Sequence, residues 1–237
     1  MIDANKWNKK LKKARADKST SVFYDSDYWK EYWKERFGKE SISVDESSTK
    51  SEALKKLGFV KRKFPHVKSV LAIGCAFGAF VYHSRKAGYN THGIDVSEYA
   101  ISIAPEEIRE FLKVGNIIDL PYKENEFELV TCFDILEHLF IEEIFSAVDE
   151  VVRVASHGIF CKLPVSGYEG EVAIVDRSYE SYDKSHVSVY PWDFWIRRFV
   201  ESGKFELVNC SMYLNAKVPK EYYQNSIEGW IAFRRKK

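Results

Sequence analysis

Two glycines and one carboxylate stand where predicted strands end. Gly74 and Gly78 follow the apolar run 69–73, and Asp95 ends the next apolar run, 21 residues after Gly74. Glycine lets the backbone turn sharply and approach a ligand without a Cβ, and the N–H groups that begin the following helix can bind a carboxylate or phosphate. A carboxylate ending the second strand can accept both hydroxyl protons of a ribose. These residues predict a site for a nucleoside cofactor.

Each of these residues also has a simpler interpretation. The glycines fit tight strand–helix packing without any ligand. Asp95 fits the N-cap of a helix, although Ser97 suits that role better. A nicotinamide dinucleotide fits as well, with Gly74, Ala76 and Ala79 in its glycine-motif positions. The first two strands therefore do not identify the cofactor.

Three further segments distinguish between the possible cofactors. They follow the predicted strand 111–114 and read GNIIDLP at 115–121, FELV at 127–130 and FDILEHL at 133–139. In this order and spacing the chain resembles the Rossmann-like (class I) methyltransferases that use S-adenosylmethionine (SAM), particularly the small-molecule and quinone methyltransferases. The resemblance covers residues 67–165. It implies a methyltransferase with SAM as cofactor and S-adenosylhomocysteine (SAH) as product.

The resemblance also implies which residues bind the cofactor. Residues 74–78 face the methionine part of SAM, Asp95 holds the ribose, and Val96 and Ile117 lie against the adenine. Asn116 stands where the family usually has Asp, and its carbonyl oxygen can accept a hydrogen bond from the adenine amino group. The implied cofactor-binding residues are Gly74, Cys75, Ala76, Gly78, Asp95, Val96, Asn116, Ile117, Phe133, Asp134 and His138.

Two positions depart from the family's pattern. Ala72 replaces the usual acid two residues before Gly74, and Ala76 replaces the middle glycine of the loop. Alanine forbids an easy positive φ. These changes imply weaker cofactor binding and are the basis for one alternative, a non-catalytic SAM-binding or regulatory protein.

The methyl acceptor is expected to contact the polar segment 164–190, because a loop of this length in a compact domain is usually functional or disordered. Its hydroxyl and charged groups suit a small polar metabolite, sugar-like or phenolic, methylated at O or N. Asp183 and His186 resemble the Asp-x-x-His of related enzymes, which predicts His186 as a general base oriented by Asp183. The alternative is a structural histidine. Tyr182 is predicted to line the acceptor side.

An aromatic helix precedes Gly38. Tyr28 and Trp29 of this helix, with Tyr24 just before it, are predicted to form a lid over the cofactor, because aromatic rings interact favourably with a sulfonium cation. Packing of the same rings against the sheet is the alternative. Asp25 can cap this helix.

The remaining pattern predicts the fold that positions these residues. About seven strands alternate with helices over residues 51–233, which is typical of a doubly wound α/β fold. We expect a mostly parallel seven-stranded sheet with helices on both faces and an antiparallel C-terminal strand. Residues 1–50 are predicted to form a basic and aromatic N-terminal helical extension, with 39–50 as a linker. Residues 51–237 are predicted to form the methyltransferase domain, with 164–190 as an acceptor-side insertion and a first helix at 51–63.

Composition excludes several classes of protein. The formal net charge is +1, so the whole molecule does not attract nucleic acid or anionic membrane. The basic termini leave an RNA methyltransferase as an alternative. The four cysteines form no CxxC pair and have no nearby histidines at zinc-like spacing, so no metal site is expected. Reduced cysteines and the lack of a bilayer-length apolar segment predict a cytoplasmic protein.

Overall fold

The structure is a computed structural model that describes residues 4–17, 21–39, 41–165, 185–213 and 227–237. The chain divides into two units, Met1–Pro121 and Tyr122–Lys237. The predicted acceptor residues Tyr182 and Asp183 lie outside the described residues. Among the described residues, no helix combines the length and apolar character that a membrane crossing requires.

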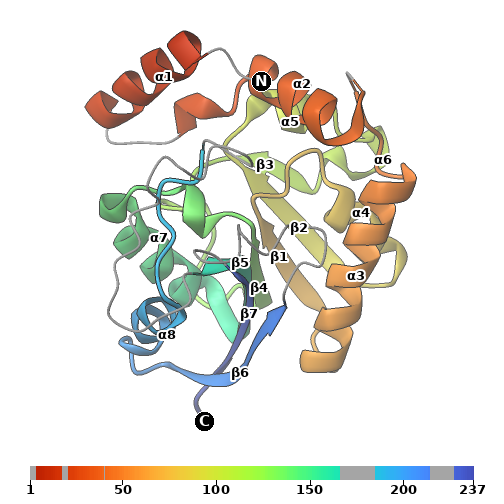
Figure 1. Ribbon diagram of the computed structural model, residues 1–237. Coiled ribbons are helices and arrows are strands. Elements are labelled where there is room, and N and C mark those ends of the chain that lie inside the picture. The colour runs from red at the N-terminus through yellow and green to blue at the C-terminus, as the bar shows by residue number, and fades with distance from the viewer. Residues whose placement is uncertain (1–3, 18–20, 40, 166–184, 214–226) are drawn as a thin grey trace. The chain divides into compact units, whose positions relative to one another are not determined.

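The strands of the first unit are adjacent in the order β3-β2-β1, and those of the second in the order β4-β5-β7-β6 (Figure 1). Strand β7 runs antiparallel to both of its neighbours, whereas β2 is parallel to β1 and β3, and β4 is parallel to β5. The prediction of a mostly parallel sheet with an antiparallel C-terminal strand is therefore confirmed. The strands are β1 (Ser69–Ile73), β2 (Asn90–Asp95), β3 (Leu112–Val114), β4 (Phe127–Phe133), β5 (Ala155–Val165), β6 (Phe205–Tyr213) and β7 (Ile227–Arg235).

In the first unit, local sequence signals set the ends of the aromatic helix α2 (Ser26–Phe37). The Asp25 carboxylate accepts a hydrogen bond from Tyr28 N at 3.0 Å, and Gly38 ends the helix with a φ of 66°. The other helical segments of this unit are α1 (Ala4–Asp17), η1 (Ser21–Phe23), α3 (Ser47–Lys63), α4 (Ala79–Lys86), α5 (Glu98–Ser102) and α6 (Glu106–Arg109).

The linker prediction for residues 39–50 is wrong at its C-terminal end, where α3 begins at Ser47. Ala53, Leu57 and Val60 form the buried face of α3, and this burial stabilises the helix over the polar first turn as well. The helix α1 was not predicted, because its basic sequence shows only weak apolar periodicity.

In the second unit, α7 (Ile141–Val154) packs against β4 and β5, and α8 (Trp192–Val200) packs against β6 and β7. A single 3-10 turn, η2 (Leu136–His138), follows β4. The carboxylate of Glu143 accepts a hydrogen bond from Phe140 N at 3.0 Å and so begins α7. Trp195 and Phe199 of α8 are fully buried, as the amphipathic pattern of this helix predicts.

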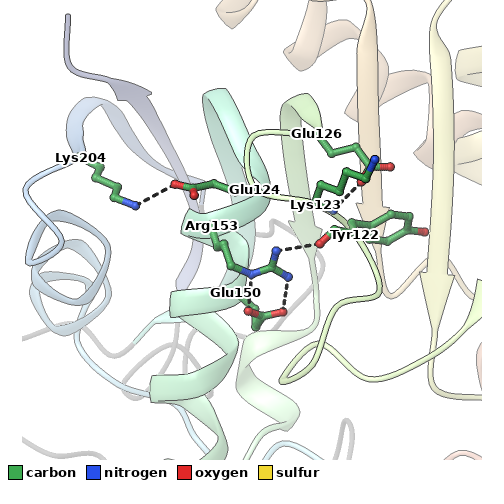
Figure 2. A network of polar contacts seen from close by, with 7 residues as sticks. All are labelled: Tyr122, Lys123, Glu124, Glu126, Glu150, Arg153 and Lys204. Atoms are coloured by element: carbon green, nitrogen blue, oxygen red, sulfur yellow. Dashed lines mark hydrogen bonds and ion pairs between the residues drawn. The ribbon is translucent and has the colours of Figure 1, made fainter.

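The C-terminal end of α7 is tied to the segment that leads into β4 (Figure 2). The Arg153 guanidinium donates to both carboxylate oxygens of Glu150 at 2.6 and 2.7 Å, and to the carbonyl oxygen of Tyr122 at 2.7 Å. A second ion pair in this network, between Lys204 and Glu124 at 3.4 Å, joins two exposed side chains. The Arg153 contacts therefore carry more of the free energy of unfolding than the Lys204 pair.

We expect Arg153→Met to lower the free energy of unfolding by about 1–3 kcal/mol, because it removes a two-pronged charged pair and a bond to a backbone carbonyl. Lys204→Met is the matched control and should cost less than about 1 kcal/mol. Urea unfolding followed by circular dichroism measures both. Equal losses in the two variants would contradict this assignment.

Candidate active site

The carboxylate of Asp95 is the centre of the predicted cofactor site. Its Oδ2 accepts a hydrogen bond from Ala76 N and its Oδ1 one from Ser97 N, both at 2.8 Å. The backbone carbonyl of Asp95 accepts from Gly115 N at 2.9 Å. Asp95 therefore joins the loops that follow β1, β2 and β3, which are the segments the sequence predicts to bind the cofactor.

Burial changes the acidity of the Asp95 carboxylate. Asp95 is 8% exposed, and burial raises its pKa, while the N–H groups of Ser97, Ala76 and Val96 oppose that rise. The side chain is directed at backbone N–H groups of the loops. It is thus held by hydrogen bonds at the strand ends.

The loop 74–78 has an unusual backbone. Gly74, Ala76 and Gly78 all have positive φ, at 66°, 49° and 85°. A Cβ on Gly78 would lie 2.5 Å from Cδ1 of Ile108, so glycine is required there for both space and conformation. Ala76 adopts the left-handed region without that freedom, which costs about 1–2 kcal/mol of strain.

Gly93 in β2 supports this loop, and the sequence analysis gave it no role. A Cβ at Gly93 would lie 2.7 Å from Sγ of Cys75 and 2.8 Å from Cδ2 of Leu112. A glycine inside a strand signals such a close approach, so the sequence did contain the information. Burial, and to a lesser extent the negative charge of Asp95, raise the pKa of the Cys75 thiol well above its ordinary value. The side chain is therefore a neutral thiol that packs against its neighbours.

The turn after β3 holds the two residues predicted to contact adenine. Oδ1 of Asn116 accepts a hydrogen bond from Ile118 N at 3.2 Å, so its amide oxygen is held beside the turn and retains a second lone pair. Ile117 is 6% exposed. Val96, next to Asp95, is half-buried. The adenine contacts of Asn116, Ile117 and Val96 stay predictions.

The aromatic helix α2 reaches the same loops. Nε1 of Trp29 donates to Oγ of Ser97 at 2.9 Å, and that hydroxyl donates to the carbonyl oxygen of Tyr24 at 2.6 Å. The Tyr28 ring is buried against Tyr24 and Trp29, with centroids 5.0 and 5.3 Å apart. In Figure 1, α2 lies beside α5, the helix that Ser97 caps. Two of the predicted lid residues, Trp29 and Tyr24, are therefore hydrogen-bonded to Ser97, two places after Asp95.

The predicted site residues of the second unit occupy two different environments. Phe133 packs in the core against Phe160 and Trp230, with ring centroids at 5.6 and 5.9 Å. Asp134 has a φ of 60°, and its Oδ1 forms an ion pair with Nζ of Lys162 at 2.7 Å. Asp134 is thus a fixed carboxylate at the end of β4, whereas Phe133 is mainly a core residue.

His138 and His186 come together around one buried carboxylate. Nε2 of each histidine lies 4.0 Å from Oε1 of Glu137, and the two ring centroids are 4.7 Å apart. A described carboxylate close to His186 is thus that of Glu137, whereas the predicted orienting residue, Asp183, lies outside the described residues. Glu137 belongs to the motif at 133–139, but the sequence analysis gave it no role.

We expect Ala76→Gly to raise the free energy of unfolding by about 0.5–1 kcal/mol, because relief of the φ strain exceeds the added chain entropy of glycine. Gly78→Ala is the opposite change in the same loop and should destabilise the protein. Urea unfolding of the two variants beside the unmodified protein measures both. A destabilised Ala76→Gly would show that the loop carries no strain at this position.

Comparisons with known proteins bear on the same segments. Residues 71–161 match the family described as "Methyltransferase domain". Ajmaline N-methyltransferase of Rauvolfia serpentina is 31% identical over 99 residues, which are 38% of this chain and 33% of that protein. The chain covers between 33% and 41% of the length of the curated relatives it matches.

Solved structures share the fold over most of the chain. Magnesium protoporphyrin IX methyltransferase of Synechocystis PCC 6803, solved with bound SAH, has a TM-score of 0.62 at 15% identity and covers 89% of this chain and 98% of its own. The cyclase SpnF has a TM-score of 0.64 at 14% identity, covering 82% and 85%. At these identities the likeness establishes the Rossmann-like fold.

Proposed function

We propose that this protein transfers a methyl group from SAM to an oxygen or nitrogen of a small polar metabolite, since residues 71–161 match the family described as "Methyltransferase domain". The observation that carries the proposal is the carboxylate of Asp95, held by Ala76 N and Ser97 N at the ends of β1 and β2. A carboxylate in this place can accept the two hydroxyl protons of an adenosyl ribose.

The loops joined by Asp95 suit the other parts of the cofactor. The backbone N–H groups of residues 74–78 suit the methionine carboxylate, and the turn at Asn116 and Ile117 suits the adenine, with Val96 beside it. On the family resemblance we also assign Phe133, Asp134 and His138 of the second unit to the cofactor. The solved relative with bound SAH supports this cofactor class.

The chemistry asks little of the protein beyond alignment. SAM, when bound, supplies a methyl group already activated on a sulfonium sulfur. The residues of this chain hold the reacting atoms in line and exclude water. A hydroxyl acceptor must also lose a proton, and we propose His186 for that task, with Asp183 orienting its ring.

The acceptor class rests on the polar character of residues 164–190 and on one relative. The hydroxyl and charged groups of this segment suit a sugar-like or phenolic acceptor. The curated ajmaline enzyme is named an N-methyltransferase, so a nitrogen acceptor is an equal part of the proposal. Mass spectrometry of a co-purified ligand would identify the acceptor directly.

Asp95→Asn tests the proposed cofactor site. We expect this variant to bind SAH about 10- to 100-fold more weakly, because it replaces a charged acceptor of two hydroxyl protons. Isothermal titration calorimetry measures the affinity, and Glu106→Gln, an exposed carboxylate of the same unit, is the control. Unchanged affinity in Asp95→Asn would reject the site, and absence of SAH binding by the unmodified protein would favour a non-catalytic relative.

The same titration has a pH readout. Because burial raises the pKa of Asp95, its carboxyl takes up a proton closer to neutrality than an ordinary carboxyl does. The ionised form accepts the ribose protons, so SAH affinity should be present above this pKa and should fall as the pH is lowered through it. Asp95→Asn has no proton to gain, and its affinity should change less over the same range.

Trp29→Phe tests whether α2 acts as a lid. The change keeps an aromatic ring and removes the N–H that donates to Ser97. We expect SAH to dissociate about 2- to 10-fold faster, the effect of one lost neutral hydrogen bond. Stopped-flow displacement measures the rate, with Lys30→Met, an exposed change on the same helix, as control. An unchanged dissociation rate would show that these rings serve packing alone.

A further inference from the structure

We propose that Glu137, His138 and His186 form a binding site for a divalent first-row transition metal ion such as Zn²⁺ or Mn²⁺. Each residue offers one ligand atom, and these atoms all lie within 4.8 Å of one another. Two imidazoles and one carboxylate are a ligand set typical of catalytic zinc and non-haem iron sites. This site goes beyond the methyltransferase proposal, and cation binding does not depend on that proposal.

The spacing suits a cation better than a direct hydrogen bond. Oε1 of Glu137 lies 4.0 Å from Nε2 of both His138 and His186, which is too long for a hydrogen bond in either pair. Ligand atoms that bind one cation at about 2.1 Å lie about 3.4 Å apart in tetrahedral geometry, and at most about 4.2 Å. To reach the tetrahedral spacing, the two 4.0 Å distances would contract by about 0.6 Å, and the widest separation, up to 4.8 Å, by about 1.4 Å.

A hydrogen bond fixes which nitrogen of His138 faces the cluster. Oγ of Ser185 lies 2.8 Å from Nδ1 of His138, and Ser185 is fully buried. This contact occupies Nδ1 and leaves Nε2, the atom near Glu137, as the ligand. A residue that orients a metal-binding imidazole through its other nitrogen is a usual part of such sites.

The backbone brings His186 to the cluster without help from a cation. Val187 N and Ser188 N both donate to the carbonyl oxygen of Glu137, at 2.9 and 3.0 Å. These bonds dock the segment 185–188 onto η2. The ligand from the far segment is thus pre-positioned, which lowers the entropy cost of binding a cation.

Burial and charge agree with a cation at this place. The Glu137 side chain is 1% exposed, whereas those of His138 and His186 are 13% and 20% exposed. A buried carboxylate is stabilised by a positive charge close to it. The carboxylate of Asp134, in the same motif, shows such a pairing, with Nζ of Lys162 at 2.7 Å. The partly exposed histidines leave one side of the site open to solvent.

An open coordination position gives the cation a chemical use that rests on the proposed function. A hydroxyl bound to a divalent cation loses its proton at a much lower pH than a free one. The site would then activate a hydroxyl acceptor. Metal binding and general-base catalysis by His186 exclude each other at one moment, because the coordinating nitrogen has no lone pair left for a proton.

Direct metal binding tests the proposal without any assay of activity. The full chain is freed of metal with EDTA, exchanged into chelator-free buffer, and titrated calorimetrically with ZnCl₂, MnCl₂ and MgCl₂. We expect one Zn²⁺ or Mn²⁺ per chain and weaker Mg²⁺ binding, since Mg²⁺ prefers oxygen ligands. His186→Asn should weaken binding at least tenfold, and Ser185→Ala by about tenfold through its effect on His138. His66→Ala, an exposed histidine of the other unit, should bind as the unmodified protein does.

Thermal unfolding keeps the result interpretable if a variant is less stable. Added Zn²⁺ or Mn²⁺ should raise the Tm of the unmodified protein and of His66→Ala, but not that of His186→Asn. No stoichiometric binding to the unmodified protein, or equal binding by His186→Asn, would overturn the site. SAH titration after EDTA treatment separates the two proposals, because retained SAH affinity without metal binding rejects the metal site and leaves the methyltransferase proposal standing.

Discussion

The buried carboxylate of Asp95 is the constraint on which the loops at the strand ends of the first unit depend. An anion removed from water must be stabilised by nearby donors, and here these are backbone N–H groups of two loops. The loops are thereby held in one arrangement, including the left-handed residue Ala76. The strain at Ala76 persists because the hydrogen bond from its own N–H to Asp95 compensates for it.

The hydroxyl of Ser97 extends this constraint to the N-terminal segment. It caps α5, accepts from the indole of Trp29 and donates to the carbonyl of Tyr24. A single small side chain therefore links the carboxylate region to α2. Displacement of α2 would break hydrogen bonds at Ser97, the residue whose N–H also donates to the Asp95 carboxylate.

The sequence predicted the sheet well because buried parallel strands are continuous apolar runs between turn residues. β1 lies where it was predicted, at Ser69–Ile73, and Ser97 and Asp25 cap helices as their residue types suggest. The helix α1 and the first turn of α3 were missed, because their polar residues carry no periodic signal. Apolar residue type alone does not predict burial: Phe145 of α7 is 48% exposed and contacts the Arg198 guanidinium.

The site was predictable only where it is local in sequence. Glycines, Asp95 and Asn116 are each read from a strand end and its next few residues. The cluster at Glu137 needs a partner from a segment far along the chain, and only the bonds from Val187 N and Ser188 N reveal it. Gly93 was overlooked although its strand position was informative, since its importance comes from Cys75 on the neighbouring loop.

The two ends of the segment between β5 and residue 185 are both anchored. Val165 closes β5 and Ser185 begins the stretch docked on Glu137, and both are fully buried. Lengthening a connection between fixed ends costs only about 0.6 kcal/mol for each doubling. A change of length between these two anchors should therefore cost little free energy of unfolding, and His186 would keep its register against Glu137.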